Sequence, residues 1–227
     1  MTDSEYEGLP EELRVEKLKK EIERLNAGIF KDEAEAANIV LKNEAFEREL
    51  SYQRAKASES RIFTFWGEVG GTSAGATIET LDTWSRKSPG EPIKIVLNSP
   101  GGAVFPGLAL FDFLQDIKGR GHQLTVKTIG YAASMGGVLL QAGDERIMSP
   151  NSFLMIHEIS FGMLGVKLQE AEDEVAFARR LWHKLVHILA ERSVYTHAQI
   201  LRKSKPKDWW IEADEALKAG FIDRIES

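Results

Sequence analysis

Hydrophobic and polar positions alternate with two different periods over residues 61–227, and these periods predict both strands and helices. Short runs rich in β-branched and aromatic residues predict strands at 61–67, 93–98, 123–130 and 152–157. The remaining stretches predict helices at 73–87, 104–117 and 135–143, a long helix at about 166–192, and a final αβ-like piece ending in FIDRIES. Such alternation is typical of βαβ units around a parallel sheet, so the expected fold class is α/β.

Residues 1–60 follow a different pattern, which predicts a charged helical segment separate from a domain at 61–227. Within residues 9–30 one apolar position recurs every three or four residues, and Pro10 stands where a first helical turn tolerates it. These positions are Val15, Leu18, Ile22, Leu25 and Ile29. A second helical stretch is predicted at about 32–57. The narrow apolar stripe fits a helix packed on the chain's own body and a partner-binding or coiled segment equally well.

The composition is that of a soluble globular chain. A hydrophobic content of 43% over 227 residues is enough to bury one large core or two modest ones. The chain has no cysteine, which excludes disulfides, thiolate metal sites and a cysteine nucleophile. The longest apolar runs are far shorter than a membrane span, and the start of the chain lacks the hydrophobic region of a signal peptide. We therefore expect neither a signal peptide nor a membrane anchor, and the absence of cysteine leaves the redox compartment undecided. The expected location is the cytoplasm.

The net charge of −6 is concentrated in the first 60 residues. Those residues hold 10 Lys and Arg against 15 Asp and Glu, whereas the remainder holds 19 against 20. Binding to a phosphate backbone requires a basic stripe, and the sequence contains none. Nucleic acid is therefore not an expected partner.

Three predicted strands end in residues that could carry chemistry, and in open α/β sheets ligands bind beyond the carboxyl ends of the strands. The turn NSPGG at 98–102 is either a plain connection or a place where Gly102 lets a substrate approach a bare N–H group. Ser134, in GYAASMGG, is either a helix N-cap or a nucleophile whose neighbour Met135 offers its N–H to an oxyanion. The pattern G-x-S-x-G is not met, because Ala132 stands two residues before the serine.

His157 ends the third of these strands, 23 residues after Ser134. It is either a structural histidine or a general base that faces the serine. A serine–histidine pair requires a carboxylate to orient the imidazole, and many acidic residues follow in the chain. Spacing alone does not choose among them.

Five separated stretches together carry a family resemblance: RIFTFWGEV, IKIVLNSPGGAVFPGLALFDFL, GYAASMGG, MSPNSFLMIHE and DWWIEADEALKAGFID. In order and spacing they are similar to the Clp protease proteolytic subunit over about residues 61–225. The resemblance implies a serine endopeptidase with Ser134 as nucleophile, His157 as base and Asp208 as the third member of the triad. It also implies an oxyanion hole formed by the backbones of Gly102 and Met135, with no metal and no cofactor.

The same resemblance implies an architecture and an assembly. The fold would be the repeated βαβ units shared with crotonases, with a protruding helix-strand handle and, in this chain, an extra N-terminal helical segment. The handle would include the helix at about 166–192, preceded by Gly162 and Gly165. This helix would be an assembly element and not a core helix of one subunit; the alternative is a long helix that lies flat on its own sheet. Protein or peptide substrates would be cut inside a homo-oligomer of stacked heptameric rings.

Departures from the family pattern leave the partners open. Glu158-Ile159 stands in place of Gln-Pro after the histidine, and Lys207 replaces an arginine whose planar fork a lysine cannot reproduce. The segment 1–60 is much longer than the short axial segment of typical members. The resemblance therefore does not by itself imply that this chain docks on an ATP-dependent unfoldase, which stays a possible partner. Three alternatives remain: a phage-type capsid maturation protease that works without an unfoldase, a crotonase-like acyl-CoA enzyme, and an inactive ring subunit. All three expected triad residues are present, which disfavours the last.

Overall fold

The computed structural model describes residues 61–160, 168–205 and 207–227, together with Lys20 and Lys42. The helices predicted for residues 1–60 and the Gly162–Gly165 region lie outside the described residues. In chain order the elements are β1 (Ile62–Trp66), α2 (Gly71–Lys87), β2 (Ile93–Ser99), α3 (Val104–Gly119), β3 (Leu124–Ala133), α4 (Met135–Leu140), β4 (Glu145–Met148), β5 (Phe153–Ile156), α5 (Leu168–Ala190), α6 (His197–Ser204), β6 (Trp209–Glu212), α7 (Ala213–Lys218) and β7 (Arg224–Ile225).

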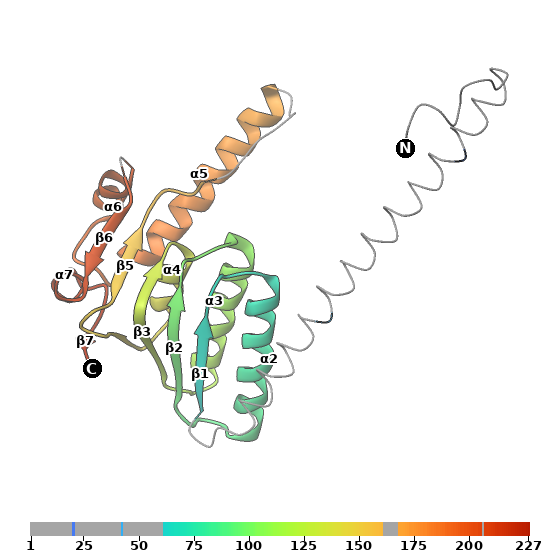
Figure 1. Cartoon of the computed structure of the whole chain (residues 1–227), viewed down its shortest axis with the longest axis vertical. Coiled ribbons are helices and arrows are strands. Elements are labelled where there is room, and N and C mark those ends of the chain that lie inside the picture. Colours follow the sequence, from blue (N-terminus) through green and yellow to red (C-terminus); the bar gives the residue numbers. More distant parts are fainter. Residues whose placement is uncertain (1–19, 21–41, 43–60, 161–167, 206) are drawn as a thin grey trace, which may run out of the picture. The chain divides into compact units, whose positions relative to one another are not determined.

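A largely parallel sheet forms the framework, which confirms the expected α/β class. Its strands run in the order β1-β2-β3-β4-β7, each parallel to its neighbour (Figure 1). Along β2 every second residue is buried, as expected where one face of a strand packs on helices. Crossover helices α2 and α3 lie side by side and supply buried residues such as Leu81 and Leu114 (Figure 1).

The sheet divides along β3. The first part of β3 pairs with β4 through Thr125 to Thr128, whereas residues 131–133 pair in parallel with β5. Strand β6 then adds to β5 in the antiparallel direction. This division sends β5 and β6 away from the main sheet and brings the ends of three strands together (Figure 1).

Strand β4 is absent from the sequence-based prediction. It opens with Glu145 and Arg146, so its apolar pattern is short and interrupted by charge. In the fold Arg146 is nevertheless only 2% exposed, because its guanidinium is fully paired there. A contact between residues distant in the chain therefore explains a strand that the local pattern did not indicate.

Helix α5 has two different halves. Its C-terminal half packs into the domain with buried Trp182, Leu185 and Leu189, whereas residues 170–180 are mostly exposed. The expectation that the whole helix lies outside the core of its own subunit is thus wrong for the C-terminal half. Its apolar positions there are buried where α5 packs against α4 and α6, as in any amphipathic helix that packs on its own domain. Figure 1 shows the other half extending beyond the body of the domain.

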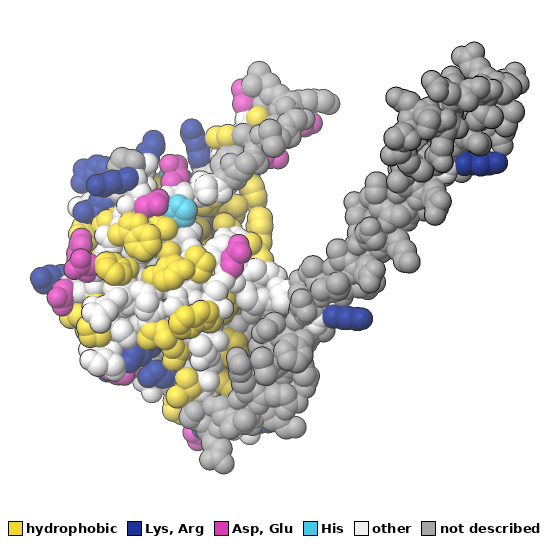
Figure 2. Space-filling view, viewed as in Figure 1, with side chains coloured by type: hydrophobic (Ala, Val, Ile, Leu, Met, Phe, Trp, Pro, Cys, Tyr) yellow, Lys and Arg dark blue, Asp and Glu magenta, His cyan; other side chains and the backbone are white. Residues whose placement is uncertain are grey.

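Several large hydrophobic side chains remain on the surface. Trp66 is 68% exposed, Phe105 61% and Trp210 49%. Figure 2 shows hydrophobic side chains gathered on one face of the described domain, with single acidic side chains among them. Contiguous apolar surface of this kind is typical of interaction sites. No helix in the described part of the chain is long and apolar enough to cross a membrane.

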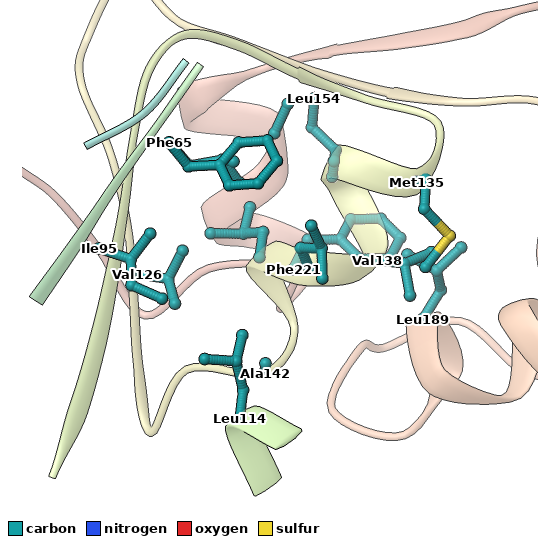
Figure 3. Close-up of a cluster of buried hydrophobic side chains, with 14 of the residues drawn as sticks. Phe65, Ile95, Leu114, Val126, Met135, Val138, Ala142, Leu154, Leu189 and Phe221 are labelled. Atoms are coloured by element: carbon teal, nitrogen blue, oxygen red, sulfur yellow. The ribbon is translucent and has the colours of Figure 1, made fainter. Parts of the chain in front are cut away.

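The core lies between the sheet and its helices. Strand residues Phe65, Ile95 and Val126 meet Leu114 of α3, while Val138 of α4 lies near Leu189 of α5 (Figure 3). Because α4 is buried along its whole length, the residue that precedes it is held on a rigid base.

A charged network joins β4 to the C-terminal segment and to the end of α5. Arg146 donates from Nε, Nη2 and its backbone N–H to the two carboxylate oxygens of Asp223, over 2.7–3.0 Å, and from Nη1 to Gln141. Arg192 adds a second guanidinium at 3.0 Å from Asp223. Partial burial alone would raise the pKa of Asp223, but these hydrogen bonds and charges outweigh it and hold the pKa below its ordinary value.

We expect Asp223→Asn to lower the free energy of unfolding by about 2–4 kcal/mol near pH 7, because it leaves the buried Arg146 without its counter-charge. A carboxylate with a lowered folded pKa stabilises above its unfolded pKa, and this contribution is lost as pH falls through the folded value. The difference between the variant and the parent should therefore shrink below about pH 4. Urea unfolding at several pH values measures it. Asp112→Asn, at an exposed position on α3, is the matched control. An Asp223→Asn protein as stable as this control at pH 7 would contradict the assignment.

Candidate functional site

Ser134 stands between the end of β3 and the start of α4. Its backbone has φ 53° and ψ −120°, an uncommon conformation for a residue with a side chain. The N–H of Ser134 donates to the carbonyl oxygen of Met155 at 2.9 Å, which ties the turn to β5. Its hydroxyl does not cap α4 and lies 2.7 Å from Nε2 of His157. The sequence left Ser134 as either a helix N-cap or a nucleophile, and its side chain does not form the N-cap hydrogen bond.

The strand register explains why three distant residues meet. Ala133 pairs with Met155 between parallel β3 and β5, so Ser134 and the end of β5 lie close together. Ile156 pairs with Trp209 between antiparallel β5 and β6. The next residues outward are His157 and Asp208, which the antiparallel ladder places opposite each other.

The imidazole of His157 bridges the other two side chains. Its Nε2 faces the Ser134 hydroxyl, and its Nδ1 lies 3.8 Å from Oδ1 of Asp208. The latter distance is longer than a hydrogen bond but close enough for electrostatic attraction to an imidazolium. The Asp208 side chain is 56% exposed, whereas that of His157 is 26% exposed. In unliganded enzymes catalytic hydrogen bonds are often long and shorten in the substrate complex.

The two predicted oxyanion-hole residues flank the serine. Met135 is the first residue of α4, and Gly102 lies in the turn that follows β2. In the described part of the chain, neither the Gly102 N–H nor the Met135 N–H donates a hydrogen bond to a loop or helix-cap acceptor. Gly102 and Met135 line the same pocket as Ser134, and free backbone N–H groups are donors of the kind that stabilise a tetrahedral oxyanion.

The glycines of this turn are required by space as well as by backbone conformation. A Cβ on Gly101 would come within 2.6 Å of Ser134 Cβ. One on Gly102, where φ is +143°, would come within 2.3 Å of the Val69 carbonyl oxygen. The turn is clamped on that side, because Val69 N–H donates to Gly101 and Ala103 N–H donates to Val69, both at 2.7 Å.

A pocket with a volume of about 350 Å³ opens beside these groups. Its lining includes Ser134, His157 and Gly102, and much of the rest is apolar. Trp182, Leu185 and Leu189 of α5 contribute to the apolar part. Such a pocket suits an apolar substrate side chain next to the bond that reacts. No group of three or more His, Asp or Glu among the described residues is arranged to hold a metal ion.

Some contributors to the pocket escaped the sequence analysis. Trp182, Leu185 and Leu189 lie on a helix for which nothing local in the sequence indicates that it reaches the site. Glu68 also lines the pocket, two residues after the end of β1. The same rule that singled out the ends of the other strands could have identified Glu68, because it follows a strand at its carboxyl end.

Comparison with known proteins agrees with this geometry. The profile of the family described as Clp protease matches residues 47–227. A curated relative, the ATP-dependent Clp protease proteolytic subunit 3 of Synechococcus sp. (strain CC9902), is 33% identical over 169 residues, which cover 74% of this chain and 82% of that protein. The comparisons support neither the acyl-CoA enzyme nor the capsid maturation alternative.

We expect Gly102→Ala to reduce kcat/KM for peptide hydrolysis by at least about 10²-fold, because the new methyl group displaces the turn that presents the Gly102 N–H. Hydrolysis of a fluorogenic peptide measures the effect, and circular dichroism checks the fold.

Gly75→Ala is the matched control for this substitution. A Cβ on Gly75, within α2, meets nothing within 4 Å, so the variant should keep its activity and gain about 0.5–1 kcal/mol of stability. Unchanged hydrolysis by Gly102→Ala would show that this N–H does not act.

Proposed function

The chain belongs to the Clp protease family and is a serine-type peptidase, and from this premise we propose that Ser134, His157 and Asp208 are its catalytic triad. The observation that carries the proposal is the 2.7 Å contact between the Ser134 hydroxyl and His157 Nε2. The position of Asp208 on the opposite side of the imidazole supports the third assignment.

In the proposed mechanism His157 takes the proton of Ser134 as its Oγ attacks the carbonyl carbon of the scissile peptide bond. Asp208 orients the imidazole with a proton on Nδ1 and stabilises the imidazolium. The N–H groups of Gly102 and Met135 donate to the developing oxyanion. His157 then returns the proton to the leaving amine. A water molecule, activated by the same imidazole, hydrolyses the acyl-enzyme and regenerates Ser134.

The pocket supports an endopeptidase that acts on extended, accessible segments of protein. Its apolar lining would receive one side chain of the substrate beside Ser134. Small residues around the serine leave the backbone open to a peptide, which is the reason we give for the run GYAASMGG. A folded substrate would not reach these groups, so unfolded or exposed segments are the proposed substrate class.

A serine-directed fluorophosphonate followed by peptide mapping tests this assignment, and we expect Ser134 to be the labelled residue. Asp208→Asn should slow both labelling and peptide hydrolysis, by about 10²–10⁴-fold, because the imidazole loses the group that fixes its tautomer. Asp214→Asn, an exposed aspartate in α7, is the control and should react like the parent.

If Asp214→Asn lost peptidase activity and Asp208→Asn kept it, the assignment of Asp208 as the triad carboxylate would be wrong. Label on another serine, with full hydrolysis in Ser134→Ala, would contradict the proposed nucleophile.

We further propose that the peptidase works as an oligomer in which residues 170–180 of α5 contact another copy. The exposed half of α5 carries partly buried Val175 and exposed Phe177, whose ring stacks on Phe105 at 6.2 Å between centroids. The relative's name describes a proteolytic subunit of an ATP-dependent protease, which supports both assembly and an ATP-driven partner. The family match starts at residue 47, which supports a separate role for most of residues 1–60.

We expect light scattering to give a mass many times the 25.4 kDa of one chain. Val175→Glu should yield oligomers of lower mass, because burying a carboxylate in an apolar contact between copies costs a free energy several times RT. Glu174→Gln, on the same exposed half of α5, should leave the mass unchanged. A parent protein that is monomeric and fully active at low concentration would contradict the assembly.

A further inference from the structure

Glu68 is the only Asp, Glu, Lys or Arg among the described residues that line the pocket. Its side chain lies directly against the oxyanion turn, since a Cβ on Gly102 would come within 2.8 Å of Glu68 Cγ. The rest of the lining near Ser134 is apolar or neutral apart from His157. The Glu68 side chain therefore lies beside the Gly102 turn and lines the same pocket as Ser134.

The backbone that carries Glu68 is held on both sides. Gly67 N–H donates to the Asn98 carbonyl oxygen at 2.9 Å, and Val69 N–H donates to that of Gly101 at 2.7 Å. The hydroxyl of Ser73 donates to the carbonyl oxygen of Glu68 itself at 2.8 Å. These bonds fix the residue relative to the turn at Gly102, so its charge acts from a defined place rather than from a free loop.

No cation of the described residues pairs with the Glu68 carboxylate, and the side chain is exposed. Glu158, next to His157, differs in this respect. It lines a neighbouring hollow together with Arg179 and Lys205, whose charges offset its own. Asp208 faces the imidazole of His157 and does not line the pocket. Of Glu68 and Glu158, Glu68 is thus the carboxylate whose field reaches a substrate without local compensation.

We propose that Glu68 is a specificity-determining residue that favours substrates with a lysine or arginine near the scissile bond. This inference rests on the proposed function of the site. The apolar pocket would hold one side chain, and the carboxylate would attract a cationic side chain a short distance along the same peptide. For an exposed carboxylate the expected preference is about fivefold in kcat/KM, because such ion pairs contribute at most about 1 kcal/mol.

The test uses the full-length protein and short fluorogenic peptides with one fixed apolar residue. Lys, Gln or Glu is placed in turn at each neighbouring position, and kcat/KM is measured for each peptide. We expect at least one position where Lys exceeds Gln by about fivefold, with the ratio falling at high salt. Glu68→Gln should bring this ratio to about one, and Glu68→Lys should make the Glu peptide the better substrate at the same position.

Glu79→Gln is the matched control. Glu79 is an exposed glutamate of α2 outside the pocket, so its replacement should leave the ratio at the parent value. The inference is overturned if neutral peptides are cleaved and Ser134 is labelled while no position favours Lys, or if Glu68→Gln keeps the preference. Failure to cleave any peptide or to label Ser134 would overturn the proposed function, and this inference with it.

Discussion

The register of β5 between β3 and β6 is the constraint on which the site depends. Two pairings, Ala133 with Met155 and Ile156 with Trp209, place the ends of three strands together. Side chains alternate between the faces of a strand, so a slip of one residue would turn His157 away from Ser134. Leu154, Met155 and Ile156 are all buried, so β5 packs on both faces, and its pairings with β3 and β6 hold the register.

Near this register lie three residues with positive φ, one of which is not glycine. Ser134 has a positive φ although it is not glycine, and Gly101 and Gly102 have φ values of +94° and +143°. Each such conformation is tolerated because neighbouring elements leave no alternative. The buried helix α4 lies on one side of Ser134, and the Val69 backbone clamps the glycine turn on the other. Strain at Ser134 is therefore maintained by packing that is itself ordinary.

Periodicity was sufficient to predict most strands and helices of the domain, because their burial follows local sequence. It could not reveal β4, whose buried Arg146 depends on Asp223, 77 residues later in the chain. Nor could it separate the two halves of α5, since buried Leu185 and exposed Phe177 look alike as apolar positions. Ser134 and His157 were each ambiguous alone, and the family resemblance, rather than spacing, selected Asp208. Proximity between residues 134, 157 and 208 is a property of strand pairing, which no local pattern contains.

The order in which the site residues occur along the chain has a consequence for folding. Asp208 directly precedes β6, and β6 joins the sheet only by adding to β5, which itself pairs with β3. Pairings between distant strands form late, since the entropy of closing long loops must be overcome first. A chain still emerging from the ribosome holds the serine and the histidine before it holds the aspartate or the strand that carries it. The proposed triad is therefore complete only after β6 has paired with β5, and a chain that still lacks β6 carries the serine and the histidine without their carboxylate.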